Sequence, residues 1–246
     1  MSGMIVNPYF GGTGCETQPG TDPDFASVVA LLHFNGTDAS TTFTDETGKT
    51  WTAAGDAQID TAEKKLGSAS GLFDGTGDYI STPDSADFAF GSGDFTIEAW
   101  VRLVAYNVGS TSAIITQRTT STSDHSFSFQ CASSSVAGAI EFQWTTDGTT
   151  LNEVETSGGF VPLDEFTHVA VCRSGTDLNI FVNGTLVETG AISGTLHDSG
   201  QEVKIGANNA TPISFLNGWI DELRVTKGVA RYTSSFLIQC NEFADS

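Results

Sequence analysis

Alternation of apolar and polar residues with a period of two runs through most of this chain. In FTIEAWVRL (95–103) apolar side chains occupy the odd positions from Phe95 to Val101, and HSFSFQC (125–131) repeats the pattern. The same period is found in AIEFQWTT (139–146), THVAVCR (167–173), LNIFVNG (178–184) and EVKIGA (202–207). Because a strand points successive side chains to opposite faces, each segment predicts a β-strand with one buried face.

Turn sequences separate these segments. Asn183-Gly184 lies between two β-rich runs and is the strongest hairpin signal, and the chain has 27 Gly but only 6 Pro. The single segment with helical character, DTAEKKLG (60–67), ends on Gly67. Roughly a dozen or more short strands with frequent turns predict an all-β fold, a two-sheet antiparallel sandwich formed by one domain.

The first 24 residues carry no alternating pattern. This Gly/Thr/Pro-rich segment has one small apolar cluster, made of Ile5, Val6, Tyr9 and Phe10. We expect residues 1–24 to form an extended arm that attaches the protein to a particle or partner, with a frayed terminus as the alternative. The sandwich is expected over 25–238, and 239–246 form a C-terminal tail.

Charge excludes two classes of partner. The chain has 30 Asp and Glu against 10 Lys and Arg, a formal net charge of −20. Phosphate contacts need clustered Lys and Arg, so we expect neither nucleic acid nor an anionic membrane as a partner. No apolar run reaches the roughly 18 residues of a membrane span, and the first residues lack the basic and apolar regions of a secretory signal.

The four cysteines show no metal-binding spacing. Cys131 and Cys172 lie in predicted strands and are expected to be buried free thiols. Cys15 and Cys240 lie in the two terminal segments, where a disulfide is possible but is not supported by any pattern.

Four segments in order resemble the LamG-like jelly rolls of the concanavalin A-like lectin/glucanase superfamily. The segments are LLHFNG (31–36), GLFDGTGDYISTPDSADF (71–88) with GDFTIEAWVRL (93–103), EFTHVAVCRSGTDLNIFVNGTLVETG (165–190) and GWIDELRVTKGVARYTSSF (218–236). Phe166 stands where the family usually has Trp. The resemblance covers about 28–236 and implies a concanavalin A-like jelly roll.

The resemblance also implies one structural Ca²⁺. Asp221 would supply a carboxylate, with Asn35, Gly36 and Asp74 as companion ligands. Alternation places Asp221 on the face of Leu223 and Val225, where an inward acid needs a cation or hydrogen bonds. The alternative is that Asp221 caps a turn or accepts backbone N–H groups.

Glycan recognition calls for exposed aromatic and polar groups. Trp100, Trp144 and Arg224 are the candidate glycan or partner contacts, although aromatic residues in sandwiches more often fill the core. Lys227 and Arg231 flank a glycine turn and are expected to be solvated.

The superfamily also includes glycosidases, but their E-x-D-x-(x)-E spacing is absent. Glu153 and Glu155 share a strand face without a third carboxylate, so we expect no enzymatic activity. The four histidines (33, 125, 168 and 197) lack zinc-binding spacing, and His168 is expected to be structural.

The ending DELRVTKGVARYTSSF (221–236) further resembles LamG-like modules of tailed-bacteriophage virion proteins. It implies a non-enzymatic protein on the virion surface, as capsid decoration, head fibre or tail-associated module. Its partners would be major capsid or tail proteins and host-surface glycans, and a homo-oligomer is expected, with a trimer as one option. The alternatives are a free carbohydrate-binding lectin and, less favoured, a glycoside hydrolase.

Overall fold

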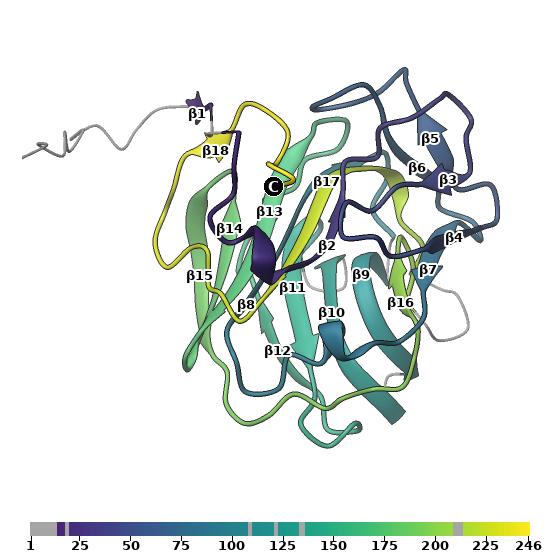
Figure 1. The fold of residues 1–246 in the computed structure, drawn as a ribbon. Helices are drawn as coiled ribbons and strands as arrows, with labels where there is room; N and C mark the ends of the chain where they lie inside the picture. Colours follow the sequence, from purple (N-terminus) through teal and green to yellow (C-terminus); the bar gives the residue numbers. More distant parts are fainter. Residues whose placement is uncertain (1–13, 18–19, 108–109, 121–122, 133–135, 209–213) are drawn as a thin grey trace, which may run out of the picture.

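The computed structural model describes residues 14–17, 20–107, 110–120, 123–132, 136–208 and 214–246. The predicted arm residues Ile5, Val6, Tyr9 and Phe10 lie outside these ranges. Two antiparallel sheets pack face to face, as predicted, and Figure 1 shows their strands running in two layers. Within the described residues, no helix is long and apolar enough to cross a membrane.

One sheet, here called the covered sheet, is centred on β8 and β17. Its order is β15 (Thr185–Ala191), β14 (Asp177–Val182), β13 (Thr167–Ser174), β8 (Phe95–Leu103), β17 (Asn217–Lys227), β6 (Ser70–Asp74) and β5 (Gln58–Asp60), with β2 (Val28–Leu32) also paired to β17. The predicted Asn183-Gly184 turn joins β14 to β15 as a hairpin, and both residues have positive φ.

The other sheet, here called the second sheet, is centred on β9 and β10. Its order is β12 (Asn152–Glu155), β11 (Ala139–Trp144), β10 (Ser123–Ala132), β9 (Thr111–Thr120), β16 (Val203–Ile205), β7 (Tyr79–Thr82), β4 (Trp51–Ala54) and β3 (Thr42–Phe43). Two 3-10 turns, Phe25–Ser27 and Ala86–Phe88, are the helical segments among the described residues.

The core between the sheets follows the predicted alternation. Phe95 stacks on Phe90 at 4.6 Å between ring centroids and contacts Phe142 of the second sheet at 5.5 Å. Phe127 and Phe129 point inward as well. Burial of one apolar face from each sheet is the main stabilising contribution to a sandwich of this kind.

Strand β17 departs from the alternation because it contains a β-bulge. Its register with β8 shifts between Asp221 and Arg224, and Glu222 has a φ of 52°. Asp221 therefore lies opposite Trp100 on the outer face of the covered sheet, whereas Leu223 and Val225 enter the core. The prediction that Asp221 shares their face is wrong, since an extra residue reverses the side-chain alternation.

The segment 60–67, the predicted helix candidate, forms no helix. Asp221 Oδ2 accepts hydrogen bonds from the backbone N–H groups of Lys65 and Leu66, at 2.8 and 2.9 Å. These two N–H groups therefore bind a side chain of β17 instead of backbone carbonyls of a helical turn. The weak helical preference of this segment is overridden by a tertiary hydrogen-bond acceptor.

The terminal segments cover the outer face of the covered sheet (Figure 1). Strand β1 (Cys15–Glu16) pairs in parallel with β18 (Ile238–Gln239), and a disulfide joins Cys15 to Cys240. Part of the predicted arm is thus docked on the sandwich. Apolar contacts lie beneath both segments, in the clusters Phe25, Val28, Leu31 and Phe243, and Ala170, Cys172, Phe181, Leu186, Tyr232 and Phe236. Cys131 and Cys172 are buried free thiols, as predicted.

Candidate functional site

A buried charge network lies beneath the terminal segments. Glu98 of β8 is fully buried, and Arg224 donates to its Oε1 through Nε and Nη2 at 3.0 and 2.8 Å. Tyr232 donates to Oε2 at 3.0 Å, and His168 Nε2 lies 3.2 Å from the same oxygen. Burial alone would raise the pKa of Glu98, but Arg224, His168 and Arg231 together outweigh it and hold that pKa well below its usual range. His168 is structural, as predicted.

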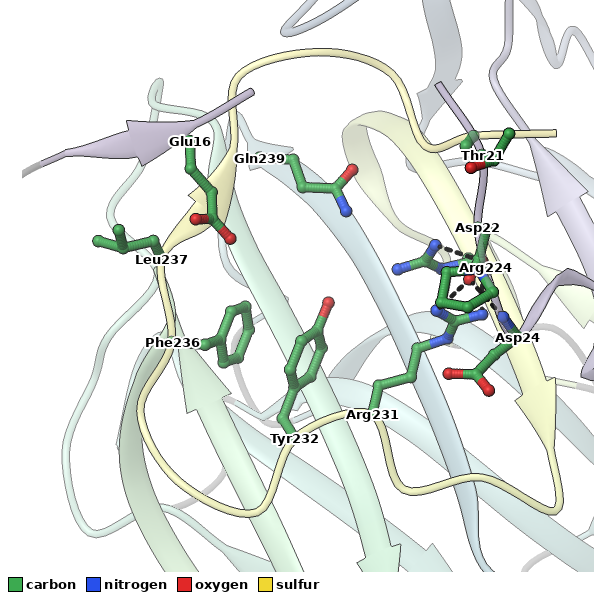
Figure 2. Close-up of a pocket in the computed structure, with 12 residues that line it drawn as sticks. Glu16, Thr21, Asp22, Asp24, Arg224, Arg231, Tyr232, Phe236, Leu237 and Gln239 are labelled. Atoms are coloured by element: carbon green, nitrogen blue, oxygen red, sulfur yellow. Dashed lines mark hydrogen bonds and ion pairs between the residues drawn. The ribbon is translucent and has the colours of Figure 1, made fainter. Parts of the chain in front are cut away.

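Asp22 extends this network to the N-terminal segment. Its Oδ2 lies 3.2 Å from Arg224 Nη1 and 2.7 Å from Arg231 Nη2. Figure 2 shows both guanidinium groups beside Asp22. Arg224 is only 2% exposed, so the prediction that it contacts a glycan is wrong. Arg231 lies in the segment after β17, where it is half-buried and paired with Asp22 rather than solvated. A pocket of about 200 Å³ beside them is lined by residues that include Tyr232, Phe236 and Leu237.

The two predicted stacking residues are also buried. Trp100 is 1% exposed, with the Lys65 ammonium 4.3 Å from its ring centroid on the outer face of the covered sheet. Trp144 is 4% exposed and stacks on Phe142 in the core. Neither indole presents a face to solvent, which contradicts their assignment as glycan contacts.

The four predicted calcium ligands do not come together. Asp221 is fully buried, and its Oδ1 has no hydrogen-bond partner among the described residues. Burial raises the pKa of Asp221 to about 7. Asp74 pairs with Asn217, four residues from Asp221 along β17 and therefore about 13 Å away. Of the four predicted ligands, Asp221 is thus the one with a buried oxygen, Oδ1, that has no hydrogen-bond partner among the described residues and could bind a cation.

The other two companions have different partners. Asn35 Oδ1 accepts from the backbone N–H and the hydroxyl of Ser68, at 2.6 and 2.7 Å. Gly36 lies against the side chain of Ile59. Asn35 also donates through Nδ2 to Glu242 in the C-terminal segment. Asn35 and Asp221 therefore both anchor the loop 65–68 through hydrogen bonds.

A second group of potential metal ligands lies next to Asn35. Single ligand atoms of His33, Glu222 and Glu242 all fall within 4.8 Å of one another, and His33 Nδ1 is 2.8 Å from Glu222 Oε1. Burial alone would lower the pKa of His33, but Glu222 and Glu242 outweigh it and raise that pKa. Sequence spacing could not reveal this group, since His33 and Glu222 are 189 residues apart.

The outer face of the second sheet carries a continuous ladder of polar side chains. We call it the outer-face ladder, and it consists of Arg118 of β9, Ser128 and Gln130 of β10, Glu141 and Gln143 of β11, and Glu153 of β12. Gln130 Nε2 donates to Glu141 Oε2 at 2.9 Å, and Gln143 Nε2 donates to Glu141 Oε1. Arg118 Nη1 lies 3.2 Å from Gln143 Oε1 and 3.3 Å from Ser128 Oγ.

Burial shifts the pKa values of the two charged residues in the inner part of the ladder. Burial raises the pKa of Glu141 to about 7, and neighbouring Glu153 adds to the rise. Burial lowers the pKa of Arg118, whose Nε has no hydrogen-bond partner among the described residues. Gln143 is half-buried and Glu153 is exposed, so the ladder reaches solvent on the β12 side.

Alternation of polar and core residues in the sequence could have indicated this ladder. In AIEFQWTT and HSFSFQC the polar residues alternate with the core residues, which places Glu141, Gln143 and Gln130 on one outer face. The glycosidase candidates Glu153 and Glu155 lie opposite Gln143 and Glu141 on β12. Glu153 thus belongs to the ladder, and Glu141 on the neighbouring strand is a further carboxylate beside it.

Comparisons with known proteins agree with the fold. A family model described as the concanavalin A-like lectin/glucanases superfamily matches residues 74–231. Comparison with curated protein sequences finds no match. Among solved structures, domain 4 of AbnA, a GH43 extracellular arabinanase from Geobacillus stearothermophilus, in complex with arabinotriose, has a TM-score of 0.63 at 18% identity, covering 83% of this chain and 94% of that one.

Toxin binding domains are also similar in structure. The binding domain of Paraclostridial Mosquitocidal Protein 1 has a TM-score of 0.62 at 14% identity, covering 83% of this chain and 50% of that one. The binding domain of botulinum neurotoxin serotype G has the same score and identity, covering 82% and 48%. The chain therefore spans about half the length of these toxin domains, and the likeness concerns the fold.

Proposed function

Because the chain belongs to the concanavalin A-like lectin/glucanases superfamily, we propose that it is a non-catalytic carbohydrate-binding domain. The observation that carries the proposal is the outer-face ladder, a row of amide, carboxylate and guanidinium groups on one sheet face. The arabinanase domain of the same fold, which is in complex with arabinotriose, supports this reading by analogy.

The chemistry of the ladder suits sugar hydroxyl groups. The Gln143 amide can donate and accept hydrogen bonds and the Glu153 carboxylate can accept them, so hydroxyls can be bound in either role at the end of the ladder that reaches solvent. The other members, Arg118, Ser128, Gln130 and Glu141, are buried and hold this end in place. Trp100 and Trp144 are buried and add no stacking area. We therefore expect weak binding per domain that becomes useful when several copies bind together.

Hydrolysis is the alternative that the Glu141–Glu153 pair raises, since a glycosidase needs one protonated and one ionised carboxyl group. Here both Glu141 oxygens accept amide N–H groups, from Gln130 and Gln143. The carboxyl is thus engaged in holding the ladder. Release of reducing sugar by the wild-type protein, lost in Glu141→Gln, would contradict binding without hydrolysis.

Glycan arrays followed by calorimetry test the binding site. We expect array signal for the wild-type protein and at least about a tenfold loss of affinity in Gln143→Ala, which removes the most accessible amide of the ladder. Glu165→Gln is the matched control, because Glu165 is exposed and lies outside the ladder. No array signal, or equal affinity in Gln143→Ala, would contradict this site.

We further propose that the domain is displayed on a bacteriophage particle, as capsid decoration, head fibre or tail-associated protein. The support is the resemblance of residues 221–236 to virion modules. Major capsid or tail proteins would then be partners, and a homo-oligomer such as a trimer would provide multivalency. The attachment residues would be Ile5, Val6, Tyr9 and Phe10.

Deletion of residues 1–13 tests the attachment. This deletion keeps the Cys15–Cys240 disulfide and the Asp22 ion pairs, so the sandwich is expected to stay folded. Immunogold labelling should then find wild-type protein, but not the deleted form, on particles. Label on no particle in either case would favour a free lectin.

A structural Ca²⁺ is proposed at Asp221, whose Oδ1 is the oxygen left free. We expect millimolar Ca²⁺ to raise the melting temperature of chelator-treated wild-type protein and to leave Asp221→Asn unchanged. An unchanged wild-type melting temperature would exclude the site.

A further inference from the structure

We propose that His33, Glu222 and Glu242 form a binding site for a transition-metal cation, Zn²⁺ by the donor set, which fastens the C-terminal segment to the covered sheet. The site is separate from Asp221. It takes its three ligands from three different segments of the chain.

The fold brings the three ligands together in a defined way. His33 follows β2, Glu222 occupies the bulge of β17, and Glu242 comes from the segment after β18. The bulge is what turns Glu222 toward the C-terminal segment, since its Oε2 accepts the backbone N–H of Phe243 at 2.8 Å. Without the extra residue in β17, the alternation would direct this carboxylate elsewhere.

The electrostatic surroundings of His33 are acidic. The charged groups that act on His33 are Glu222, Glu242 and Glu46. The side chain of Glu222 is fully buried and that of His33 is 11% exposed. Two carboxylates held together in largely buried surroundings place an excess of negative charge there, which is costly. A divalent cation would neutralise it.

Neighbouring hydrogen bonds already orient the carboxylates. Phe243 N–H fixes Glu222, and Asn35 Nδ2 donates to Glu242. Asn35 is itself held by Ser68. Fixed carboxylates are typical of metal sites, where partners behind the ligands set their orientation.

The donor set selects the type of metal. One imidazole nitrogen and two carboxylate oxygens suit Zn²⁺, which binds such ligands at about 2.0–2.2 Å and can keep a water as its fourth ligand. Ligand atoms in a tetrahedral site lie about 3.4 Å apart. The observed spread of up to 4.8 Å, with His33 and Glu222 at 2.8 Å, needs shifts of about 1 Å. Ca²⁺ prefers six or more oxygens and fits less well.

Calorimetry on the full chain with its disulfide intact tests the site. Chelator-treated protein at pH 7 would be titrated with ZnCl₂, CaCl₂ and MgCl₂. We expect one Zn²⁺ per chain and a higher melting temperature, because a metal that binds the folded state alone stabilises it.

Three variants make the assignment specific. Glu242→Gln and His33→Gln should each weaken Zn²⁺ binding at least about tenfold. His197→Gln is the control, since His197 forms a comparable His–carboxylate pair with Asp124 elsewhere on the surface. Glu242 is only partly buried, so its variant should stay folded, which circular dichroism checks.

Three results would overturn the site. These are no Zn²⁺ binding by the wild-type protein, equal binding in both ligand variants, and Ca²⁺ binding that is tighter than Zn²⁺ binding and lost in Glu242→Gln. In the first case the cluster is a His–carboxylate ion pair. None of these results bears on glycan binding by the outer-face ladder.

Discussion

Glu98 and Arg224 illustrate at the scale of single residues how a charged motif can be structural. They belong to FTIEAW and DELR, two of the segments that carry the family resemblance. Their side chains meet on the outer face of the covered sheet, where His168 and Tyr232 are further hydrogen-bond partners of the Glu98 carboxylate. The Arg224 charge, which the sequence suggested could bind a ligand, is therefore paired with Glu98 inside the fold.

Loss of one partner of this pair should be costly. Arg224→Ala leaves the Glu98 carboxylate buried without its main counter-charge, so we expect the free energy of unfolding to fall by about 3–5 kcal/mol. Urea denaturation followed by tryptophan fluorescence measures it. Lys64→Ala, at an exposed site, should change stability by less than about 0.5 kcal/mol. A loss below about 1 kcal/mol in Arg224→Ala would show that the pair contributes little.

Glu141 should make stability depend on pH near neutrality. Its pKa is about 7 in the folded protein against 4.5 ordinarily, so the folded state holds a proton that the unfolded state releases. This contribution is complete below about pH 4.5 and is lost as the pH rises through 7, by up to about 3 kcal/mol. Denaturation between pH 5 and 8 should show a shallower decline in Glu141→Gln than in the wild type. Parallel declines would contradict the raised pKa, with Glu165→Gln as the control.

Secondary-structure elements were predictable where periodicity alone decides them. The faces of β8, β10 and β11 follow from alternation because every residue of a regular strand obeys it. The bulge in β17 was not predictable, because strict alternation cannot place Ile220 on the same face as Leu223 and Val225. The sequence does not show whether Ile220 lies outside the core or an extra residue restores it to the core. Sequence reasoning consequently gave Asp221 the wrong neighbours.

The loop 65–68 tests the role of Asp221 at the element scale. Asp221→Ala leaves the N–H groups of Lys65 and Leu66 without an acceptor, and we expect a loss of about 1–3 kcal/mol. Asp221→Asn keeps an oxygen acceptor and should lose less. Hydrogen exchange should show faster exchange at Lys65 and Leu66 in Asp221→Ala, and unchanged exchange there would exclude the anchoring role.

The arrangement of the whole molecule explains why the candidate glycan contacts failed. Trp100 and Arg224 occupy the outer face of a sandwich sheet, a position that alternation alone reads as exposed. The terminal segments cover that face, and nothing local to the strands encodes the cover. The outer-face ladder was predictable in principle, because its residues alternate with the core on β10 and β11.

The cover depends on a link between the two ends of the described chain. The Cys15–Cys240 disulfide closes a loop with a sequence separation of 225, and it joins β1 to the residue that follows β18, close to the Asp22 ion pairs. Cross-links restrict the unfolded chain, so Cys15→Ser should reduce stability by about 2–4 kcal/mol. Because the sandwich has its own core, we expect the terminal segments to loosen first.

Limited proteolysis and thermal unfolding separate these two effects. In Cys15→Ser, or in wild-type protein with reductant, cleavage should fall in the terminal segments before it falls in the strands from β2 to β17, and the melting temperature should drop. Cys131 and Cys172 are already free thiols, so reductant should add nothing in Cys15→Ser. Equal melting temperatures with and without reductant would mean that ion pairs and apolar contacts hold the cover by themselves. In that case Asp22→Ala, which removes the acid shared by Arg224 and Arg231, should release it.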